Sequence, residues 1–301
     1  MTIRITNVRD DLRVITDPMQ TVETASVGAW VEVGTRDEQR DINGVSHLLE
    51  HMAFKGTTRR SAREIMEEIE AVGGQLNAYT SRENTAYFAK VLKEDTSLAI
   101  DLIGDILQNS TLDQSELDRE RAVVIQEIHQ TNDTPDDIIF DQFQEVAFPD
   151  QPIGRPVMGT VSLIEGIQRE TIKNYMEEQY SADRIVVAAS GNVDHDKFVS
   201  STEKTFTLPA SENPHEVVPV SYCGGDYREE RNLEQVHLVL GFNGIAYNDP
   251  DYYPLAVLST LLGGGMSSRL FQEAREKHGL VYSIYSFSSS YKDGGLFGIY
   301  A

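Results

Sequence analysis

Residues 47–51 read His47-Leu48-Leu49-Glu50-His51, two histidines four residues apart with a glutamate directly before the second. Each residue of an α-helix advances by about 100°, so the three polar side chains fall within an arc of roughly 100° and share one face. Histidines at i and i+4 have Cβ atoms about 5 to 6 Å apart, close enough for both imidazoles to reach one Zn²⁺. The spacing therefore predicts a helical metal site with Glu50 beside the metal.

The alternative is a chance grouping of two histidines and a glutamate on a polar helix face. The chain has only 7 histidines, and the expected number of chance matches to this pattern is on the order of 0.01. An apolar stripe accompanies the polar triplet on the same segment, and it consists of Val45, Leu48, Leu49 and Met52. Such periodicity favours an amphipathic helix, which Gly56 would end. The metal site is the preferred interpretation.

Length and composition indicate a globular protein of two domains. A chain of 301 residues exceeds the size at which a single core usually stops growing. The hydrophobic fraction of 40% and the charged fraction of 25% are ordinary. The net charge of -22 argues against nucleic acid as a partner, since phosphate binding needs clustered Lys and Arg. That charge would suit a cationic peptide substrate, or it serves solubility alone.

Cysteine content and hydropathy bear on location. Cys223 is the only cysteine, so no disulfide can form within the chain. No apolar run has the length of a membrane span, and the first residues show neither a secretory core nor an acid-free transit pattern. A cytoplasmic location, with no membrane partner, is expected.

The first two thirds of the chain alternate between strand and helix patterns. Ser61 and Glu64 form a capping box that opens a helix. Strands are expected at 12–16, 24–33, 75–81, 85–92 and 184–190, and helices at 94–107, 113–131, 160–180 and 194–206. The runs 75–81 and 85–92 should make a hairpin around a polar turn. The stretch with prolines at 135, 149, 152 and 156 reads as irregular.

The order of elements then repeats. Residues 236–242 match 25–33, 255–262 match the metal-motif helix without its ligands, and the segment from Gly279 matches that from Gly74. We therefore expect an α+β fold of two homologous αβ domains, each a mixed, mainly antiparallel sheet covered by helices. The predicted boundaries are 1–210 for the metal-binding domain, 211–222 for a linker and 223–301 for the second domain. Roughly 120 residues of the repeat have no counterpart, so the second domain is expected to be truncated.

A catalytic zinc site usually has three protein ligands, and the third is sought on the helix 113–131. Glu120 and Glu127 lie seven residues apart, bordering a stripe of Leu117, Val124 and Ile128. They are about 10.5 Å apart along the helix axis, so only one can bind the ion directly while the other orients. The residues alone do not choose between them.

Four segments together resemble the pitrilysin-type metallopeptidases, and most closely the branch that contains mitochondrial processing peptidase and its bacterial relatives. They are residues 47–51, 77–83, 120–128 and 262–271, and the resemblance extends over essentially the whole chain. It implies that Glu127 is the third ligand beside His47 and His51, holding one Zn²⁺ in the catalytic domain. Glu120 would support the ligands from a second layer. Glu50 would be the general base that takes a proton from the attacking water.

The same resemblance implies a substrate site. Arg275 and Tyr282 match an Arg and a Tyr with which the second domain holds substrate, although an exposed helix arginine and a strand tyrosine would be the ordinary interpretation. The strand 75–81, with Asn77 and Ala78, resembles the edge to which a substrate adds as an extra strand.

The leading hypothesis is a zinc metalloendopeptidase, a hydrolase that cleaves extended peptides or unstructured segments in a cavity between two domains. The alternative is a noncatalytic peptide-binding or assembly subunit of the same fold. Noncatalytic members of the family have lost ligands or carry a longer glycine-rich loop, whereas this chain keeps the ligands and a short Gly263-Gly264-Gly265 run. The expected assembly is a homodimer or a heterodimer with a subunit of the same fold.

Overall fold

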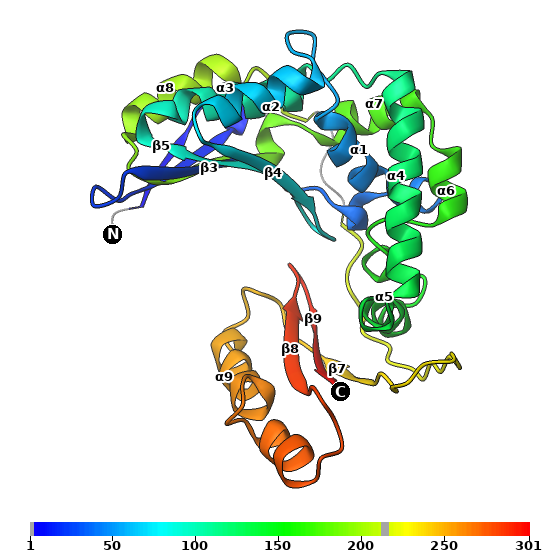
Figure 1. Ribbon diagram of the computed structural model, residues 1–301. Helices are drawn as coiled ribbons and strands as arrows, with labels where there is room; N and C mark the ends of the chain where they lie inside the picture. The colour runs from blue at the N-terminus through cyan, green and yellow to red at the C-terminus, as the bar shows by residue number, and fades with distance from the viewer. Residues whose placement is uncertain (1–2, 212–216) are drawn as a thin grey trace. The chain divides into compact units, whose positions relative to one another are not determined.

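The computed structural model describes residues 3–211 and 217–301, which form two compact units (Figure 1). The first unit takes Met1–Gln126 and Val157–Glu216, and the second takes Glu127–Pro156 and Val217–Ala301. Residues 212–216 of the predicted linker lie outside the described residues. The predicted domain boundaries at 210 and 223 stay predictions. Residues 127–156, which precede the predicted linker, belong to the second unit.

A six-stranded sheet organises the first unit. Its order is β1-β2-β6-β3-β5-β4, and all neighbours are antiparallel except the parallel pair β2 and β6. The strands are β1 (Arg4–Asn7), β2 (Arg13–Pro18), β3 (Thr24–Val31), β4 (Gln75–Thr80), β5 (Thr85–Leu92) and β6 (Ile185–Gly191). The hairpin of β4 and β5 confirms the prediction. It leaves β4 as the last strand of the sheet, beside the helix that carries the metal motif.

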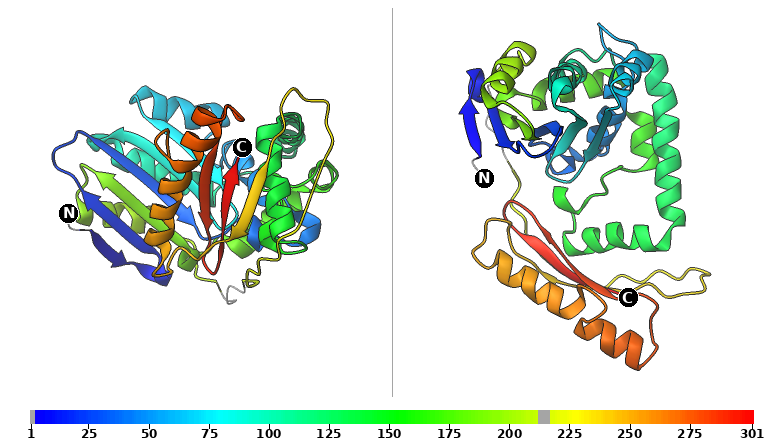
Figure 2. Two further views of the ribbon diagram at one scale, coloured as in Figure 1. Left: turned by 90° about the horizontal axis from the view of Figure 1, so that it is seen from below. Right: turned by 60° about the vertical axis from the view of Figure 1, so that its left-hand side comes forward.

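The helices of the first unit pack against the sheet or against one another. They are α1 (Val45–Ala53), α2 (Ala62–Ala71), α3 (Thr96–Gln108), α6 (Val161–Gly166), α7 (Arg169–Gln179) and α8 (His195–Thr205), with α4 (Gln114–Asp133) running on into the second unit. Short 3₁₀ turns of this unit lie at Arg9–Asp11, Thr35–Asp37, Arg40–Ile42, Lys93–Asp95 and Ala182–Arg184, and another, in the second unit, lies at Pro152–Gly154. Helices α3 and α8 lie side by side over the sheet (Figures 1 and 2). The buried faces of α3 and β3 form the core there, because alternate residues of β3 point inward.

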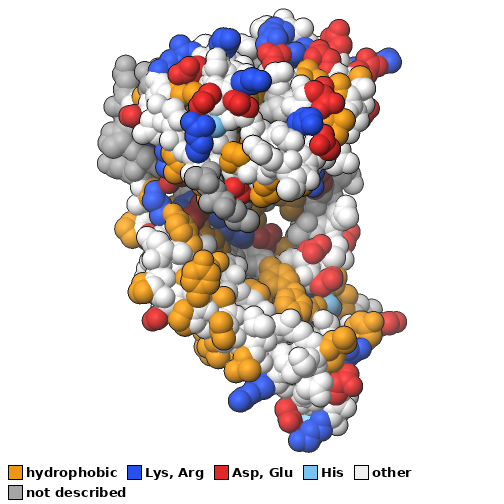
Figure 3. Space-filling model, turned by 90° about the vertical axis from the view of Figure 1, so that its left-hand side faces the viewer, with side chains coloured by type: hydrophobic (Ala, Val, Ile, Leu, Met, Phe, Trp, Pro, Cys, Tyr) orange, Lys and Arg blue, Asp and Glu red, His pale blue; other side chains and the backbone are white. Residues whose placement is uncertain are grey.

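The second unit is built on a three-stranded antiparallel sheet of order β7-β9-β8. Its elements are β7 (Val239–Asn243), α9 (Tyr252–Gly263), the π-helical turn η7 (Phe271–Lys277), β8 (Tyr285–Ser290) and β9 (Gly295–Tyr300). The order repeats β3-β5-β4 of the first unit, with α9 in the place of α1. The predicted α+β duplication is therefore confirmed. In Figure 3 hydrophobic side chains spread over the surface of the second unit, and those of α9 include Tyr253, Val257 and Leu261.

One helix was missed by the sequence analysis. Residues 135–147, expected to be irregular because of nearby prolines, form helix α5 (Pro135–Ala147). Pro135 occupies the first turn, where a missing N–H costs no hydrogen bond. The rings of Phe140 and Phe143 lie 5.3 and 6.0 Å from that of Phe287 on β8, and Phe140 stacks on Tyr300 at 5.6 Å. Helix α5 thus covers one face of the second sheet, while Ser286, the residue before Phe287, bonds to Ser259 of α9.

Two other expectations were wrong in detail. The helix expected over 160–180 is divided into α6 and α7, because the chain is extended at Ile167 and Gln168. The strand expected to follow Gly279 begins only at Tyr285. None of the described helices is both long and apolar enough to cross a bilayer.

Candidate metal centre

Helix α1 presents the first two candidate ligands on one face. The apolar stripe is buried as predicted, with Leu48 and Leu49 both 0% exposed. Burying that stripe orients the helix, and the opposite face then carries the polar triplet. The rings of His47 and His51 have centroids 4.7 Å apart. The helical spacing therefore places both imidazoles side by side, as the motif required.

Glu127 on α4 completes the group. His47, His51 and Glu127 each offer a ligand atom, and these atoms all lie within 4.8 Å of one another. Helix α4 is continuous across this region, and its buried stripe of Leu117, Val124 and Ile128 was predicted. Ligand atoms bonded to one zinc at about 2.0 to 2.2 Å lie on the order of 3 to 4 Å apart, so small side-chain rotations would bring all three to a common ion.

Glu120 lies about two helical turns before Glu127 and contacts a candidate ligand instead of joining the group. Its Oε2 accepts a hydrogen bond from Nδ1 of His51 at 3.1 Å, and its Oε1 pairs with Nζ of Lys55 at 2.7 Å. Glu120 is 6% exposed. A carboxylate on Nδ1–H sets the tautomer in which Nε2 is free to bind a metal. Glu127 thus lies with the histidines and Glu120 beside one of them, and the roles that the resemblance implied for the two stay predictions.

Glu50 is held from the neighbouring strand. Its Oε2 accepts a hydrogen bond from Oγ1 of Thr80 at 2.6 Å. Thr80 is the last residue of β4, one position before the polar turn of the hairpin. The strand was predicted but the role of Thr80 was not, although a hydroxyl at the strand end beside the metal-motif helix was a usable signal. Glu50 therefore lies on the ligand face with a defined orientation.

The donor chemistry fits zinc. Two imidazoles and one carboxylate form a ligand set typical of catalytic zinc sites, which keep a further position open. Burial, and then repulsion from His51, lowers the pKa of His47 to about 4. His47 is therefore neutral at pH 7 and offers a lone pair. Zinc can be held here by residues that the chain supplies.

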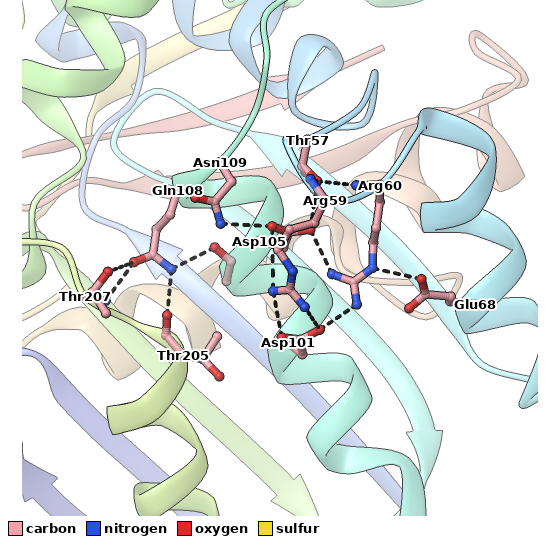
Figure 4. Close-up of polar contacts among 11 residues, drawn as sticks. Thr57, Arg59, Arg60, Glu68, Asp101, Asp105, Gln108, Asn109, Thr205 and Thr207 are labelled. Atoms are coloured by element: carbon pink, nitrogen blue, oxygen red, sulfur yellow. Dashed lines mark hydrogen bonds and ion pairs between the residues drawn. The ribbon is translucent and has the colours of Figure 1, made fainter.

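A buried ionic cluster anchors the segment that follows α1 (Figure 4). The carboxylate of Asp105, on α3, accepts hydrogen bonds from Thr57 Oγ1 at 2.8 Å, Arg60 Nη1 at 2.8 Å and Asn109 Nδ2 at 2.9 Å. The Asp105 side chain is fully buried. Residues 57–60 are thereby tied to the core at the C-terminal end of the metal-motif helix.

The candidate substrate residues lie in two places. Asn77 and Ala78 are on the edge strand β4, where the N–H of Ala78 donates to Oδ1 of Asn77 at 2.8 Å. Arg275 and Tyr282 are in the second unit, with the guanidinium 5.5 Å from the centre of the Tyr282 ring. Tyr282 is 81% exposed and lies outside the strands. Their approach to the metal centre stays a prediction.

Comparisons with known proteins identify the family of the chain. A family model described as insulinase (peptidase family M16) matches residues 13–161, and one described as the peptidase M16 inactive domain matches residues 166–301. An uncharacterized zinc protease of Streptomyces coelicolor is 42% identical over 100% of this chain and 67% of its own length. An uncharacterized zinc protease of Bacillus subtilis is 40% identical over 97% of this chain and 71% of its own length.

Two further matches are a plant protein and a solved bacterial structure. A probable mitochondrial-processing peptidase subunit beta of Arabidopsis thaliana is 39% identical over 99% of this chain, which spans 59% of that protein. A protease from Helicobacter pylori shares the fold, with a TM-score of 0.92 at 24% identity over 100% of this chain and 74% of that one. The matching models and relatives show that the chain belongs to peptidase family M16.

Proposed function

We propose that this protein is a zinc-dependent metalloendopeptidase. The observation that carries the proposal is the meeting of His47, His51 and Glu127, with their ligand atoms within 4.8 Å, beside a glutamate held on the same helix. Relatives named as zinc proteases support it. A purely structural zinc site would close with four protein ligands, whereas this group offers three.

Each residue of the group has a distinct task. His47, His51 and Glu127 would hold the ion, which when bound supplies Lewis acidity toward a peptide carbonyl and its attacking water. Glu120 keeps His51 in the metal-binding tautomer. Glu50 is the general base that takes a proton from the attacking water and later gives one to the leaving amine. The hydroxyl of Thr80 keeps that carboxylate turned toward the site.

The substrate proposed is an extended peptide or an unstructured segment. Strand β4 is the last strand of its sheet, so one backbone edge is open to an added strand beside Asn77 and Ala78. Backbone hydrogen bonds of this kind read little sequence. Arg275 and Tyr282 are proposed to bind the substrate from the second domain, and a dimer partner of the same fold is proposed to complete the assembly. The net charge of -22 favours basic peptides.

Glu50→Gln tests the proposal against the noncatalytic alternative. The purified chain should bind one zinc and cleave an unstructured peptide in a chelator-sensitive way. Glu50→Gln should keep the zinc, measured by elemental analysis, and lose about 10² to 10⁴ in rate, since it removes a general base. Glu70→Gln, an exposed glutamate of α2, is the matched control and should match the unmodified chain. The proposal would be contradicted if Glu50→Gln cleaved the peptide at the rate of the unmodified chain. It would also be contradicted if the unmodified chain showed no zinc-dependent cleavage.

A further inference from the structure

The N-terminus of the metal-motif helix has no cap of its own. The N-cap residue is Gly44, which offers no side chain, and its φ of +99° lies in the left-handed region that favours glycine. A Cβ there would stand 2.6 Å from the carbonyl oxygen of Met158 and 2.7 Å from Ile164 Cδ1. No capping side chain fits at this position. The backbone N–H groups at the start of α1 must find an acceptor elsewhere in the fold.

Glu38 supplies that acceptor from the loop that precedes the helix. Its Oε1 accepts from the N–H of Ser46 at 2.8 Å, and its Oε2 accepts from the N–H of Gly44 at 2.8 Å and from Nδ2 of Asn43 at 2.7 Å. Glu38 is 3% exposed. Burial raises its pKa to about 7, although these three donors act in the opposite direction. A carboxylate in this place also meets the positive end of the helix dipole.

The contact bears directly on the metal ligands. Ser46, which Glu38 binds, is joined by a peptide bond to His47. The hydroxyl of Ser46 lies 2.8 Å from that of Tyr175 on α7, a second tether on the same residue. The first turn of α1 is thus held from two sides at the residue before the first ligand. A short helix of 9 residues cannot absorb a change at this turn before reaching His51.

We propose that Glu38 is a positioning residue for the metal centre: by capping α1 from outside, it sets the rotation and height of the helix face that carries His47 and His51. Glu38 has no role in the chemistry itself. The inference deepens the proposed zinc site and rests on it. A positioning role predicts that the affinity for zinc, and not only the stability of the fold, depends on Glu38.

Glu38→Gln is the main test because it keeps the size of the side chain. A glutamine side chain has one accepting oxygen and one NH₂ group. The NH₂ group would face the N–H of either Gly44 or Ser46, so one of these two hydrogen bonds is lost. Zinc affinity, measured by competition with a chromogenic chelator on the folded protein, should fall about tenfold, at the lower end of the effect of supporting residues on metal binding. At zinc concentrations below saturation the cleavage rate at saturating peptide should fall with the zinc occupancy, while KM for the peptide changes little.

His195→Asn is the control for a general loss of stability. His195 is 4% exposed and bonds to Thr6 and Thr16, so its replacement weakens the core of the same unit without touching α1. Its zinc affinity should equal that of the unmodified chain. Equal zinc affinity for Glu38→Gln, or an equal loss in both variants, would overturn the inference. Failure of the unmodified chain to bind zinc would instead reject the proposed function.

If Glu38→Gln does not fold, Glu38→Asp is used for the same measurement. The shorter side chain keeps the charge but withdraws its oxygens by one methylene from the amides of Gly44 and Ser46. Weaker zinc binding supports the positioning role, and unchanged zinc binding contradicts it.

Discussion

Asp105→Ala is expected to lower the free energy of unfolding of the first unit by about 3 to 5 kcal/mol, the cost typical of removing one partner from a buried ion pair. The Asp105 side chain is fully buried, and that of Arg60 is 9% exposed. The substitution leaves Arg60 with Asp101 and Glu68 but removes the shared acceptor of Thr57 and Asn109. Each hydrogen bond to a charged group contributes about 1.5 to 3 kcal/mol. The loss of those of Thr57 and Asn109, together with the contact to Arg60 that its other partners partly replace, therefore falls within about 3 to 5 kcal/mol.

Arg59→Ala is the matched control, because Arg59 is the neighbour of Arg60 in sequence and also pairs with Asp101. Its side chain is 49% exposed, and that of Asp101 is 34% exposed. Solvent-exposed ion pairs contribute less than about 1 kcal/mol, so the control should change the unfolding free energy by no more than that.

The assay uses the only tryptophan of the chain. Trp30 lies on β3 in the first unit, so urea unfolding followed by tryptophan fluorescence reports on that unit. The midpoint should move strongly for Asp105→Ala and slightly for Arg59→Ala, with the same slope m. A loss below about 1 kcal/mol for Asp105→Ala, or one no larger than that of the control, would refute the reasoning that burial decides the strength of this cluster.

Three further predictions concern the site. Glu120→Gln should weaken zinc binding by about 10 to 100-fold in a chelator competition, because it removes the carboxylate on His51; unchanged affinity would contradict its supporting role. Thr80→Val should leave zinc content intact and lower kcat by roughly tenfold through loss of the hydrogen bond that orients Glu50, a share of the general-base effect; an unchanged kcat would show that Glu50 needs no such support. Burial raises the pKa of Glu38 in the folded chain to about 7, from an ordinary value of 4.5. The stability from this group is therefore fully present below pH 4.5 and is lost, by about 3 kcal/mol, as pH rises through 7. The difference in unfolding free energy between the unmodified chain and Glu38→Gln should follow that course, and parallel curves would show that Glu38 does not titrate in this way.

Local sequence signals predicted most elements because their causes are local. The capping box formed as expected, with the N–H of Ser61 donating to Glu64 at 2.8 Å. The alternation in 75–92 became a hairpin since alternate side chains of a strand face opposite sides. Helix α5 was missed because prolines were taken as breaks, although Pro135 begins the helix. Its place in the second unit depends on packing against Phe287, a residue distant in sequence.

Some contacts of the candidate ligands were likewise predictable from local sequence, and others were not. The spacing of His47 and His51 is a property of one helix, so the sequence predicted their approach. The choice between Glu120 and Glu127 depended on where α4 crosses α1. Thr80 and Glu38 were not identified because their hydrogen bonds exist only after the strand and the loop have packed. Thr80 lies 30 residues from Glu50, and Glu38, only 8 residues from Ser46, reaches it through an irregular loop that no periodicity describes.

The sequence by itself determined that a helix with two histidines and a glutamate on one face exists and that its unit is repeated, because both follow from the periodicity of local structure. Helix geometry left Glu120 and Glu127 open and the family resemblance implied Glu127. Only the tertiary structure placed Glu127 beside the histidines and decided which groups contact them. The reason is that these contacts join separate elements, from 8 residues apart for Glu38 and Ser46 to 129 for Ser46 and Tyr175. The relative position of those elements results from burial of the whole apolar core.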